Sequence, residues 1–205
     1  WNVRDVEPLI RRLSVSLVQR LARPCIAVGN AKRPSTTSSA TDDVHTTGLR
    51  KAAMSKFHQL QVSQIHQETR DAMVVTFAPP AEDPGAFKFE AGQHLTLKAM
   101  ISGEEVRRSY SICAGAQEQT LRVAIKKIDD GIFSNWAAEN LRQGTLIEVM
   151  EPQGHFNVPL EPEASRHHVA FASGSGITPV LSLVKTTLAA EPDSRFTLVY
   201  GNRAS

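Results

Sequence analysis

Hydrophobic and polar residues alternate along the chain from Phe57 to about Met150, as they do in strands that bury one face. Six segments carry this pattern, at residues 57–65, 73–77, 94–98, 108–113, 121–127 and 145–150. Turn-forming residues such as Pro79-Pro80 and Ser102-Gly103 separate them. One helical segment, residues 134–141, interrupts the series. The pattern predicts a small antiparallel β-barrel or sandwich.

The pattern changes after Pro162. A short apolar run at residues 169–172 leads through a glycine-rich turn into a helical pattern that starts at Pro179 and continues to about Ala189, and a second apolar run follows at residues 196–200. Apolar strands on either side of a helix are typical of a parallel sheet that is buried on both faces. We therefore expect the β-α-β opening of an α/β domain. Two strands are too few to bury such a helix, so the sequence predicts a truncated domain with uncovered apolar surface and aggregation or local disorder after residue 165.

The basic residues are concentrated in an N-terminal leader, residues 1–53, which holds nine Lys and Arg against four Asp and Glu. The remaining residues hold fourteen against seventeen, so the main body gives no reason to expect a nucleic-acid partner. In the leader, residues 5–21 place apolar residues near helical spacing, and residues 32–41 are rich in Ser and Thr, which predicts disorder. Two interpretations remain open, an organelle transit peptide and an upstream extension before a natural start at Met54, and the second is favoured.

Cysteine content and hydropathy limit the chemistry further. The two cysteines, Cys25 and Cys113, are too few for a disulfide scaffold, a four-thiolate zinc site or a four-cysteine iron–sulfur centre. The spacing of the seven histidines suggests no metal site, and Cys113 is expected to be a small buried residue rather than a reactive thiol. No apolar run approaches the roughly 18 residues of a membrane span, which predicts a soluble, cytoplasmic protein. Redox chemistry would therefore require a bound organic cofactor or a segment outside this sequence.

Arg108 and Tyr110 form the first candidate site. They stand two residues apart near the end of a predicted strand, so their side chains project from the same face. A guanidinium fork can grip a diphosphate, and an aromatic ring can cover a flat heterocycle. The alternative is an exposed strand with an incidental Arg and Tyr.

Two glycine turns form the other candidates. Residues 126–134 predict a strand end, a turn at Gly131 and a helix start, where free amide groups suit a phosphate and Ser134 either bonds a phosphate oxygen or simply caps the helix. Residues 174–179 read Gly-Ser-Gly-Ile-Thr-Pro, in which the two glycines let the backbone approach a diphosphate and Pro179 suits a first helical position. This motif lacks the third glycine of the usual dinucleotide fingerprint.

Taken together and in this order, the three motifs resemble the ferredoxin–NADP reductase superfamily over residues 57–205. The resemblance implies an FAD-binding antiparallel barrel followed by a nicotinamide-binding α/β domain. It implies that Arg108 contacts the FAD diphosphate, that Tyr110 stacks on the isoalloxazine and that Ser111 lies near flavin N5. The turn from Gly131 to Ser134 would hold the FAD diphosphate, and Lys126 and Phe133 are counted with these cofactor-binding residues.

The resemblance also assigns the second glycine turn. Gly174, Ser175 and Gly176 would hold the diphosphate of the nicotinamide cofactor, and Thr178 would lie between the two cofactors. Tyr110, Ser111 and Thr178 are thus the candidate catalytic residues. Arg203 and Ser205 lie where the family recognises the 2′-phosphate and no acidic residue accompanies them, which favours NADPH as the donor and leaves NADH possible.

Longer stretches narrow the resemblance. Residues 89–97, 107–113, 131–136 and 200–203 are similar to the reductase components of oxygenases that act in phenylacetyl-CoA degradation. This implies an enzyme that passes electrons from NADPH through FAD to a [2Fe–2S] centre, present only in the complete protein, and on to an oxygenase component or a ferredoxin. This sequence contains no C-x₄-C-x₂-C motif and therefore departs from that family at the electron exit.

Two alternatives stay open. The chain could be a stand-alone flavin or ferredoxin–NADP reductase, or a non-catalytic FAD-binding module that has lost the hydride-donor site. In every case the predicted organisation is a disordered leader at residues 1–53, an FAD-binding barrel at residues 54–162 and the start of an NAD(P)-binding domain at residues 163–205.

Overall fold

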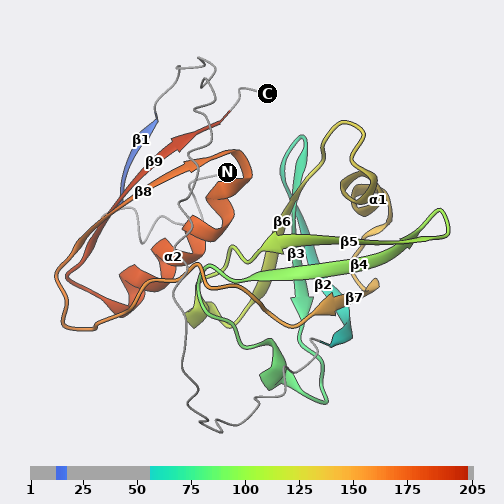
Figure 1. Ribbon diagram of the computed structural model, residues 1–205, viewed down its shortest axis with the longest axis horizontal. Coiled ribbons are helices and arrows are strands. Elements are labelled where there is room, and N and C mark those ends of the chain that lie inside the picture. The colour runs from blue at the N-terminus through green and yellow to red at the C-terminus, as the bar shows by residue number, and fades with distance from the viewer. Residues whose placement is uncertain (1–12, 18–55, 203–205) are drawn as a thin grey trace, which may run out of the picture. The chain divides into compact units, whose positions relative to one another are not determined.

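The computed structural model describes residues 13–17 and 56–202. Six antiparallel strands form the larger sheet, in the order β5-β4-β7-β2-β3-β6 (Figure 1). Their bounds are β2 Phe57–Thr69, β3 Ala72–Ala78, β4 His94–Ile101, β5 Glu104–Ser111, β6 Leu121–Lys126 and β7 Leu146–Met150. The short 3₁₀ segments η3 (Pro84–Phe87) and η4 (Ala116–Glu118) and the helix α1 (Ile132–Asn140) lie in the connections. The predicted antiparallel six-strand fold is thereby confirmed.

Alternation along these strands produces the core, because every second side chain points to the same face. Val62, Val75, Leu95 and Val123 are fully buried and belong to one hydrophobic cluster, which also includes Phe133 from α1. The two edge strands approach each other where Ile112, just after β5, bridges to Val123 of β6. The sheet therefore curls into a partly closed barrel, with α1 following the end of β6.

The second sheet is parallel and has three strands in the order β1-β9-β8, at Leu13–Leu17, Arg195–Gly201 and His167–Ser173. The turn η5 (Gly174–Gly176) connects β8 to the helix α2 (Ile177–Ala190). The predicted β-α-β unit is thus confirmed, but the expectation of only two strands is wrong, because β1 pairs with the free edge of β9.

Burial of this unit differs from the prediction in two ways. The apolar face of α2 is covered rather than exposed, because Val180, Val184 and Leu188 pack with Phe196 and Leu198 of β9. Conversely, β8 is not buried on both faces, and Val169 and Phe171 are 54% and 77% exposed. In the part of the chain that the structure describes, α2 covers one face of β8 and no element covers the other. The uncovered apolar surface therefore belongs to the strand.

Most predictions on the leader lie outside the described residues, including the Ser/Thr-rich stretch at residues 32–41 and the predicted disorder. The helical spacing over residues 5–21 is wrong for residues 13–17, which form the strand β1. The few apolar residues of the leader are compatible with a strand as well as with a helix, because a short apolar run does not distinguish these two structures.

Gly92 fixes the start of β4 against the segment that leads out of the barrel. Its φ is +87°, and a Cβ atom on it would lie 1.6 Å from the backbone carbonyl oxygen of Phe156. Only glycine permits both this backbone conformation and this close approach. The segment from β7 to β8 is thus held against the barrel before it enters the second sheet. Among the described helices, none is long and apolar enough to cross a membrane.

Candidate functional site

The strand β5 directs Arg108 and Tyr110 toward the inner face of the barrel at its open edge. Arg108 pairs with Leu97 and Tyr110 with Leu95, and both leucines are fully buried in the core. Paired residues of neighbouring strands point to the same face, so Arg108 and Tyr110 also point inward. Because β5 is an edge strand, the Arg108 side chain nevertheless reaches solvent. The two side chains therefore project together, as the sequence predicts.

Tyr110 is half-buried and packs against Phe133 of α1, with ring centroids 5.9 Å apart and planes tilted by 41°. Burial raises the pKa of the Tyr110 phenol to about 12, and the nearby Arg108 charge opposes this only in part. At neutral pH the ring is uncharged. It can therefore lie against a flat aromatic ligand without placing a negative charge beside it.

The N-terminus of α1 follows the same open edge. Gly131 is the residue before the helix, and no side chain caps it. The amide groups of residues 132–134 consequently lack acceptors inside the helix, which is the arrangement that suits an anion. The Ser134 hydroxyl is buried, accepts from the Ile128 amide at 3.4 Å and donates to the Gly131 carbonyl at 3.3 Å. Ser134 therefore shapes the turn from inside the first turn of α1. The simpler interpretation, that Ser134 caps the helix, is wrong, because the residue at the cap position is Gly131 and no side chain caps it. The amides of residues 132–134 are left for a ligand.

Gly131 is required for this turn. A Cβ atom there would lie 2.4 Å from the Ser134 hydroxyl and 2.5 Å from the Cγ1 atom of Ile128. Any larger residue would push the hydroxyl out of its place. The absence of a side chain at Gly131 thus leaves room for the Ser134 hydroxyl at the start of α1.

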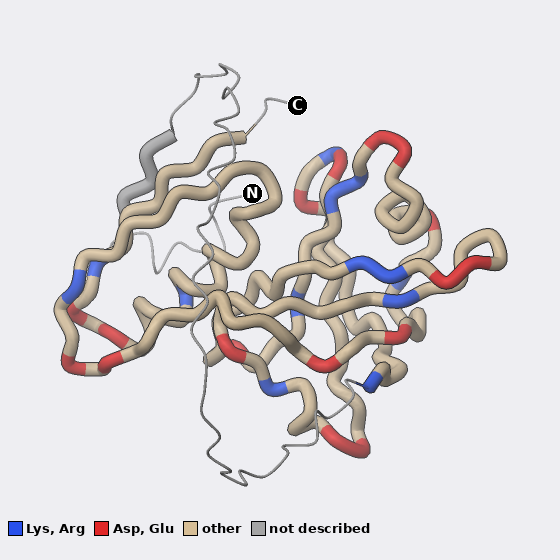
Figure 2. Tube along the Cα trace, viewed as in Figure 1, with Lys and Arg blue, Asp and Glu red and all other residues tan. Residues whose placement is uncertain are grey.

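Basic residues occupy both edges of the gap between β5 and β6. Ile112 and Val123 form the bridge between the two edges. Arg108 of β5 lies four residues before Ile112, and Lys127, the first residue after β6, lies four residues after Val123. Figure 2 shows Lys and Arg positions on β5 and at the end of β6. Lys126, another predicted binding residue, is exposed there, and the Arg108 guanidinium donates through Nη1 to the Arg107 carbonyl at 2.7 Å. A dianionic group bound at this gap would meet positive charge from two strands and the end of α1.

The second predicted site lies at the carboxyl edge of the parallel sheet, between β8 and α2. Gly174 has φ +52°, and its carbonyl accepts a hydrogen bond from the Tyr200 hydroxyl at 3.2 Å. Thr178 is buried in the first turn of α2, and its hydroxyl donates to the Ser175 carbonyl at 2.9 Å. Ligands of open α/β sheets bind at this edge. Arg203 and Ser205, predicted to recognise a 2′-phosphate, lie outside the described residues.

The two sites are connected through α2, and here the sequence analysis missed two residues. The buried Ser182 hydroxyl donates to the Ala114 carbonyl at 2.6 Å, and the Thr186 hydroxyl accepts from the Ala116 amide at 2.9 Å. Both residues belong to a series with Thr178 at four-residue spacing, which is one face of a helix. That spacing in a mainly apolar helix is the signal that could have found them.

Cys113 follows the first site and has the character that the sequence predicts. It is 3% exposed, its thiol donates to the Arg122 carbonyl at 3.4 Å, and burial raises its pKa to about 11. A thiol in this state is a poor nucleophile. Over residues 13–17 and 56–202, no group of three or more His, Cys, Asp or Glu is arranged to hold a metal ion.

Known proteins resemble this chain in sequence and in fold. Residues 59–158 match the family described as the oxidoreductase FAD-binding domain. The chain is 51% identical over 152 residues to one subunit of the 1,2-phenylacetyl-CoA epoxidase of Escherichia coli K12, covering 74% of this chain and 43% of that protein. It is 35% identical over 147 residues to the ferredoxin reductase component of 3-ketosteroid-9-alpha-monooxygenase from Rhodococcus rhodochrous, covering 70% and 40%.

A solved structure shows the same fold. Phthalate dioxygenase reductase, described as a modular structure for electron transfer from pyridine nucleotides to [2Fe–2S], superposes with a TM-score of 0.60 at 30% identity, covering 72% of this chain and 44% of that one. The chain thus spans less than half the length of each of these relatives.

Proposed function

We propose that this chain, whose residues 59–158 belong to the oxidoreductase FAD-binding domain family, binds FAD in the gap between β5 and β6 and accepts hydride from NADPH. The observation that carries the proposal is the convergence of Arg108, Tyr110 and the free amides of α1 on one open edge of the barrel. In the same proposal the flavin domain extends to residue 162 and the nicotinamide domain begins at residue 163.

The residues present fit a flavin dinucleotide. Arg108 and the amides of residues 132–134 would hold the diphosphate, with Lys126 adding charge at the rim. Tyr110, held against Phe133, would cover one face of the isoalloxazine, and Ser111 at the end of β5 would place a hydroxyl beside it. A diphosphate is present in FAD and absent from FMN, so the basic gap favours the dinucleotide.

FAD, when bound, supplies an acceptor that takes up a hydride and releases the electrons one at a time. The chain's own residues contribute position and environment. The buried Phe133 and the half-buried Tyr110 exclude water from one side of the ring site, and the phenol of Tyr110 keeps its proton because burial raises its pKa to about 12. Thr178 and Gly176 would orient the donor from the β8–α2 turn. Hydride transfer requires that the reacting atoms of the donor and the flavin come within about 3–3.5 Å of each other.

The electron acceptor is proposed from the relatives. The named relatives are a subunit of an epoxidase and a reductase component of a monooxygenase, and the solved relative transfers electrons to [2Fe–2S]. We therefore propose a cytoplasmic reductase whose electrons pass to an iron–sulfur centre, and from there to an oxygenase component acting in phenylacetyl-CoA degradation. A ferredoxin acceptor is the second candidate.

The proposal predicts that the purified protein is yellow and releases FAD upon denaturation. Absorbance near 450 nm gives the flavin content, and chromatography of the released flavin separates FAD from FMN. A stand-alone flavin reductase and a non-catalytic module would also bind FAD, and only the module would stay yellow when NADPH or NADH is added under anaerobic conditions. A colourless protein that takes up no added FAD would remove the proposal altogether.

Donor preference is a separate prediction. We expect NADPH to reduce the bound flavin faster than NADH does, because the Arg203 guanidinium and the Ser205 hydroxyl can bind a 2′-phosphate. Anaerobic stopped-flow absorbance with each donor measures the two rates. Faster reduction by NADH would overturn the assignment of Arg203.

A further inference from the structure

One face of α2 carries three hydroxyl residues in a row, Thr178, Ser182 and Thr186. They are 7%, 0% and 7% exposed, although the rest of the helix buries mainly aliphatic side chains. Successive members are four residues apart and so lie about 6 Å apart along one side of the helix. The hydroxyl stripe, as we name these three residues, begins in the predicted nicotinamide turn and runs toward the other end of α2.

The hydroxyl stripe contacts residues 112–118, which directly follow β5, the strand that carries Arg108 and Tyr110 and that we call the flavin strand. After Ser111, the amide of Ile112 donates to the Gln93 carbonyl at 2.9 Å, and the amide of Cys113 donates to the Arg122 carbonyl at 2.9 Å. Ala114 follows and is fully buried. These backbone contacts hold the segment firmly to the barrel, so it keeps a fixed distance from the end of β5.

Four polar contacts join α2 to this segment. Ser182 donates to the Ala114 carbonyl at 2.6 Å, and the Ala116 amide donates to Thr186 at 2.9 Å. Further along, the Lys185 ammonium lies 3.0 Å from Glu118, and its carbonyl accepts from Gln117 at 3.2 Å. The first two contacts are sheltered from water, where a hydrogen bond is directional and costly to leave unmade.

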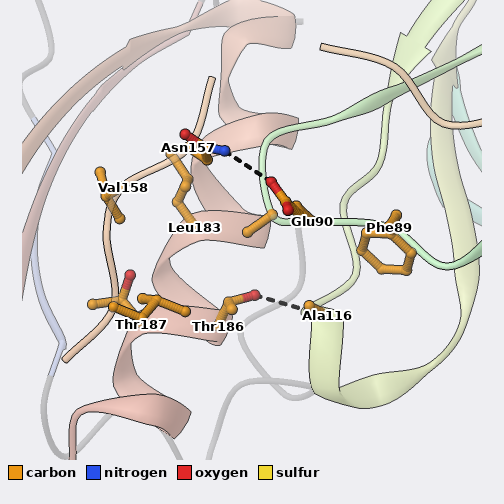
Figure 3. A pocket seen from close by; sticks show the side chains of 10 residues that line it. Phe89, Glu90, Ala116, Asn157, Val158, Leu183, Thr186 and Thr187 are labelled. Atoms are coloured by element: carbon orange, nitrogen blue, oxygen red, sulfur yellow. Dashed lines mark hydrogen bonds between the residues drawn. The ribbon is translucent and has the colours of Figure 1, made fainter. Parts of the chain in front are cut away.

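Side chains do not fill the space between α2 and the barrel completely. A cavity of about 310 Å³ lies beside the contacts, lined by Phe89, Ala116, Leu183 and Thr187 among others. Figure 3 shows Leu183 and Phe89 on opposite sides of this space and the hydrogen bond between Thr186 and Ala116 at its edge. A close-packed interface resists sliding because side chains interdigitate, and a void removes that resistance on one side. Where side chains leave this space unfilled, the hydrogen bonds of Ser182 and Thr186 hold the register of the helix.

We propose that Ser182 and Thr186 are positioning residues that hold the β8–α2 turn at a fixed place relative to the flavin strand. The proposal rests on the proposed function, because the turn matters only as the seat of the hydride donor. Ser182 is one helical turn from Thr178 and bonds a carbonyl three residues after Ser111. The hydrogen bond between the Ser182 hydroxyl and the Ala114 carbonyl thus connects the β8–α2 turn with the flavin strand over a short distance along the chain.

The test combines Ser182→Ala with Thr186→Val, which removes both hydroxyls while changing volume little. Thr186→Ser is the matched control because it keeps the acceptor for Ala116, and Ala189→Ser adds a hydroxyl at an exposed position of the same helix. Hydrogen exchange measures the amides of residues 112–118 and 174–178 in the full chain loaded with FAD. FAD affinity and the rate of flavin reduction at saturating NADPH are measured on the same proteins.

We expect the double variant to exchange faster at both segments and to bind FAD within about twofold of the wild type, since no FAD contact is changed. We expect reduction at saturating donor to slow by about tenfold with little change in KM, because small misplacements of a reacting group cost rate rather than binding. Both controls should behave as wild type. Unchanged exchange at residues 174–178, or an unchanged reduction rate despite faster exchange, would overturn the proposal.

Failure of the proposed function looks different. A wild-type protein that binds no FAD, or whose bound FAD neither nicotinamide donor reduces, would contradict the assigned activity. Hydrogen exchange at residues 112–118 and 174–178, repeated on the wild type and the double variant without added FAD, would still decide whether the hydroxyl stripe holds the turn.

Discussion

Replacing Glu191 with alanine is expected to destabilise the protein by about 3 kcal/mol, because it removes a buried carboxylate and leaves the donors around it without their acceptor. The Glu191 side chain is fully buried at the end of α2. One carboxylate oxygen accepts from Arg166 at 2.6 Å and from the Glu161 amide at 3.1 Å. The other accepts from the Ser194 hydroxyl at 2.7 Å and lies 3.2 Å from the His168 ring. One side chain thus ties the segment after the barrel to the base of the parallel sheet.

Urea unfolding followed by circular dichroism measures this loss. Glu161→Ala is the matched control, because that carboxylate lies 3.7 Å from the same Arg166 but is 68% exposed, and exposed pairs contribute about 0–1 kcal/mol. The Glu191 variant should therefore lose much more stability than the Glu161 variant. Equal and small losses in the two variants would show that the buried network contributes no more than a surface pair.

The same network makes stability depend on acid. Burial by itself would raise the pKa of Glu191, but the hydrogen bonds from Ser194 and the Glu161 amide, with those from His168 and Arg166, lower it from 4.5 to about 2. A carboxyl whose pKa is lower in the folded state stabilises the fold above its unfolded pKa. This contribution is complete above about pH 4.5 and is lost as the pH falls toward 2. The wild type should lose stability across that window more steeply than Glu191→Ala.

The Glu191 network illustrates what the sequence could not predict. Residues 191–194 read Glu-Pro-Asp-Ser, which is typical of an exposed turn, and nothing local reveals that the glutamate is buried. Its partners Arg166 and His168 are more than twenty residues away. Burial of a charge is decided by tertiary contacts, which local patterns do not encode.

The fold itself was predictable because its signals are local. Alternation placed all six barrel strands, and the change to apolar runs marked β8 and β9. The errors came where a short apolar run is compatible with two different structures. The run in β8 was expected to be buried on both faces, yet Phe171 is 77% exposed. Residues 13–17 have apolar residues near helical spacing in a leader expected to be disordered, yet they form a strand that pairs with β9. In each case a partner element, rather than the run itself, decides the outcome.

The candidate site also has one part that local sequence signals predict and another part that depends on tertiary contacts. Arg108 and Tyr110 stand two apart on a strand, so their common face followed from the sequence, and the structure places them as expected. That Tyr110 packs on Phe133 required the path of the chain between β5 and α1. The roles of these residues toward a flavin remain predictions, since they were inferred from the family resemblance and no contact inside the protein tests them.

Replacing Arg108 with alanine is expected to weaken FAD binding by about 10- to 100-fold, or roughly 1.5–3 kcal/mol, the usual contribution of hydrogen bonds to a charged group. The guanidinium is exposed at the open edge of the barrel and bonds within the protein to the Arg107 carbonyl. Its removal should therefore disturb the fold little. Fluorescence titration of the apoprotein with FAD gives the dissociation constants, and unfolding curves confirm that the variant is folded.

Arg107→Ala is the decisive control, because it removes the same charge one residue away on the opposite face of β5. Arg107 donates to Glu105 at 2.7 Å and lies over the Phe57 ring, 5.0 Å from its centroid, so it is already occupied elsewhere. If long-range attraction alone draws FAD to the basic edge, both variants should weaken binding alike, and salt should remove the difference from wild type. We expect only Arg108→Ala to weaken binding strongly, since direct contact requires a particular side chain.

Arg108→Lys then separates charge from shape. Lysine keeps the positive charge but offers a single ammonium in place of a planar fork, and it cannot bond two diphosphate oxygens in parallel. Its FAD affinity should therefore fall between wild type and Arg108→Ala, closer to the alanine variant if the fork is bidentate. Wild-type affinity in Arg108→Lys would mean that β5 supplies only charge, and the diphosphate would then be held mainly by the free amides at the start of α1.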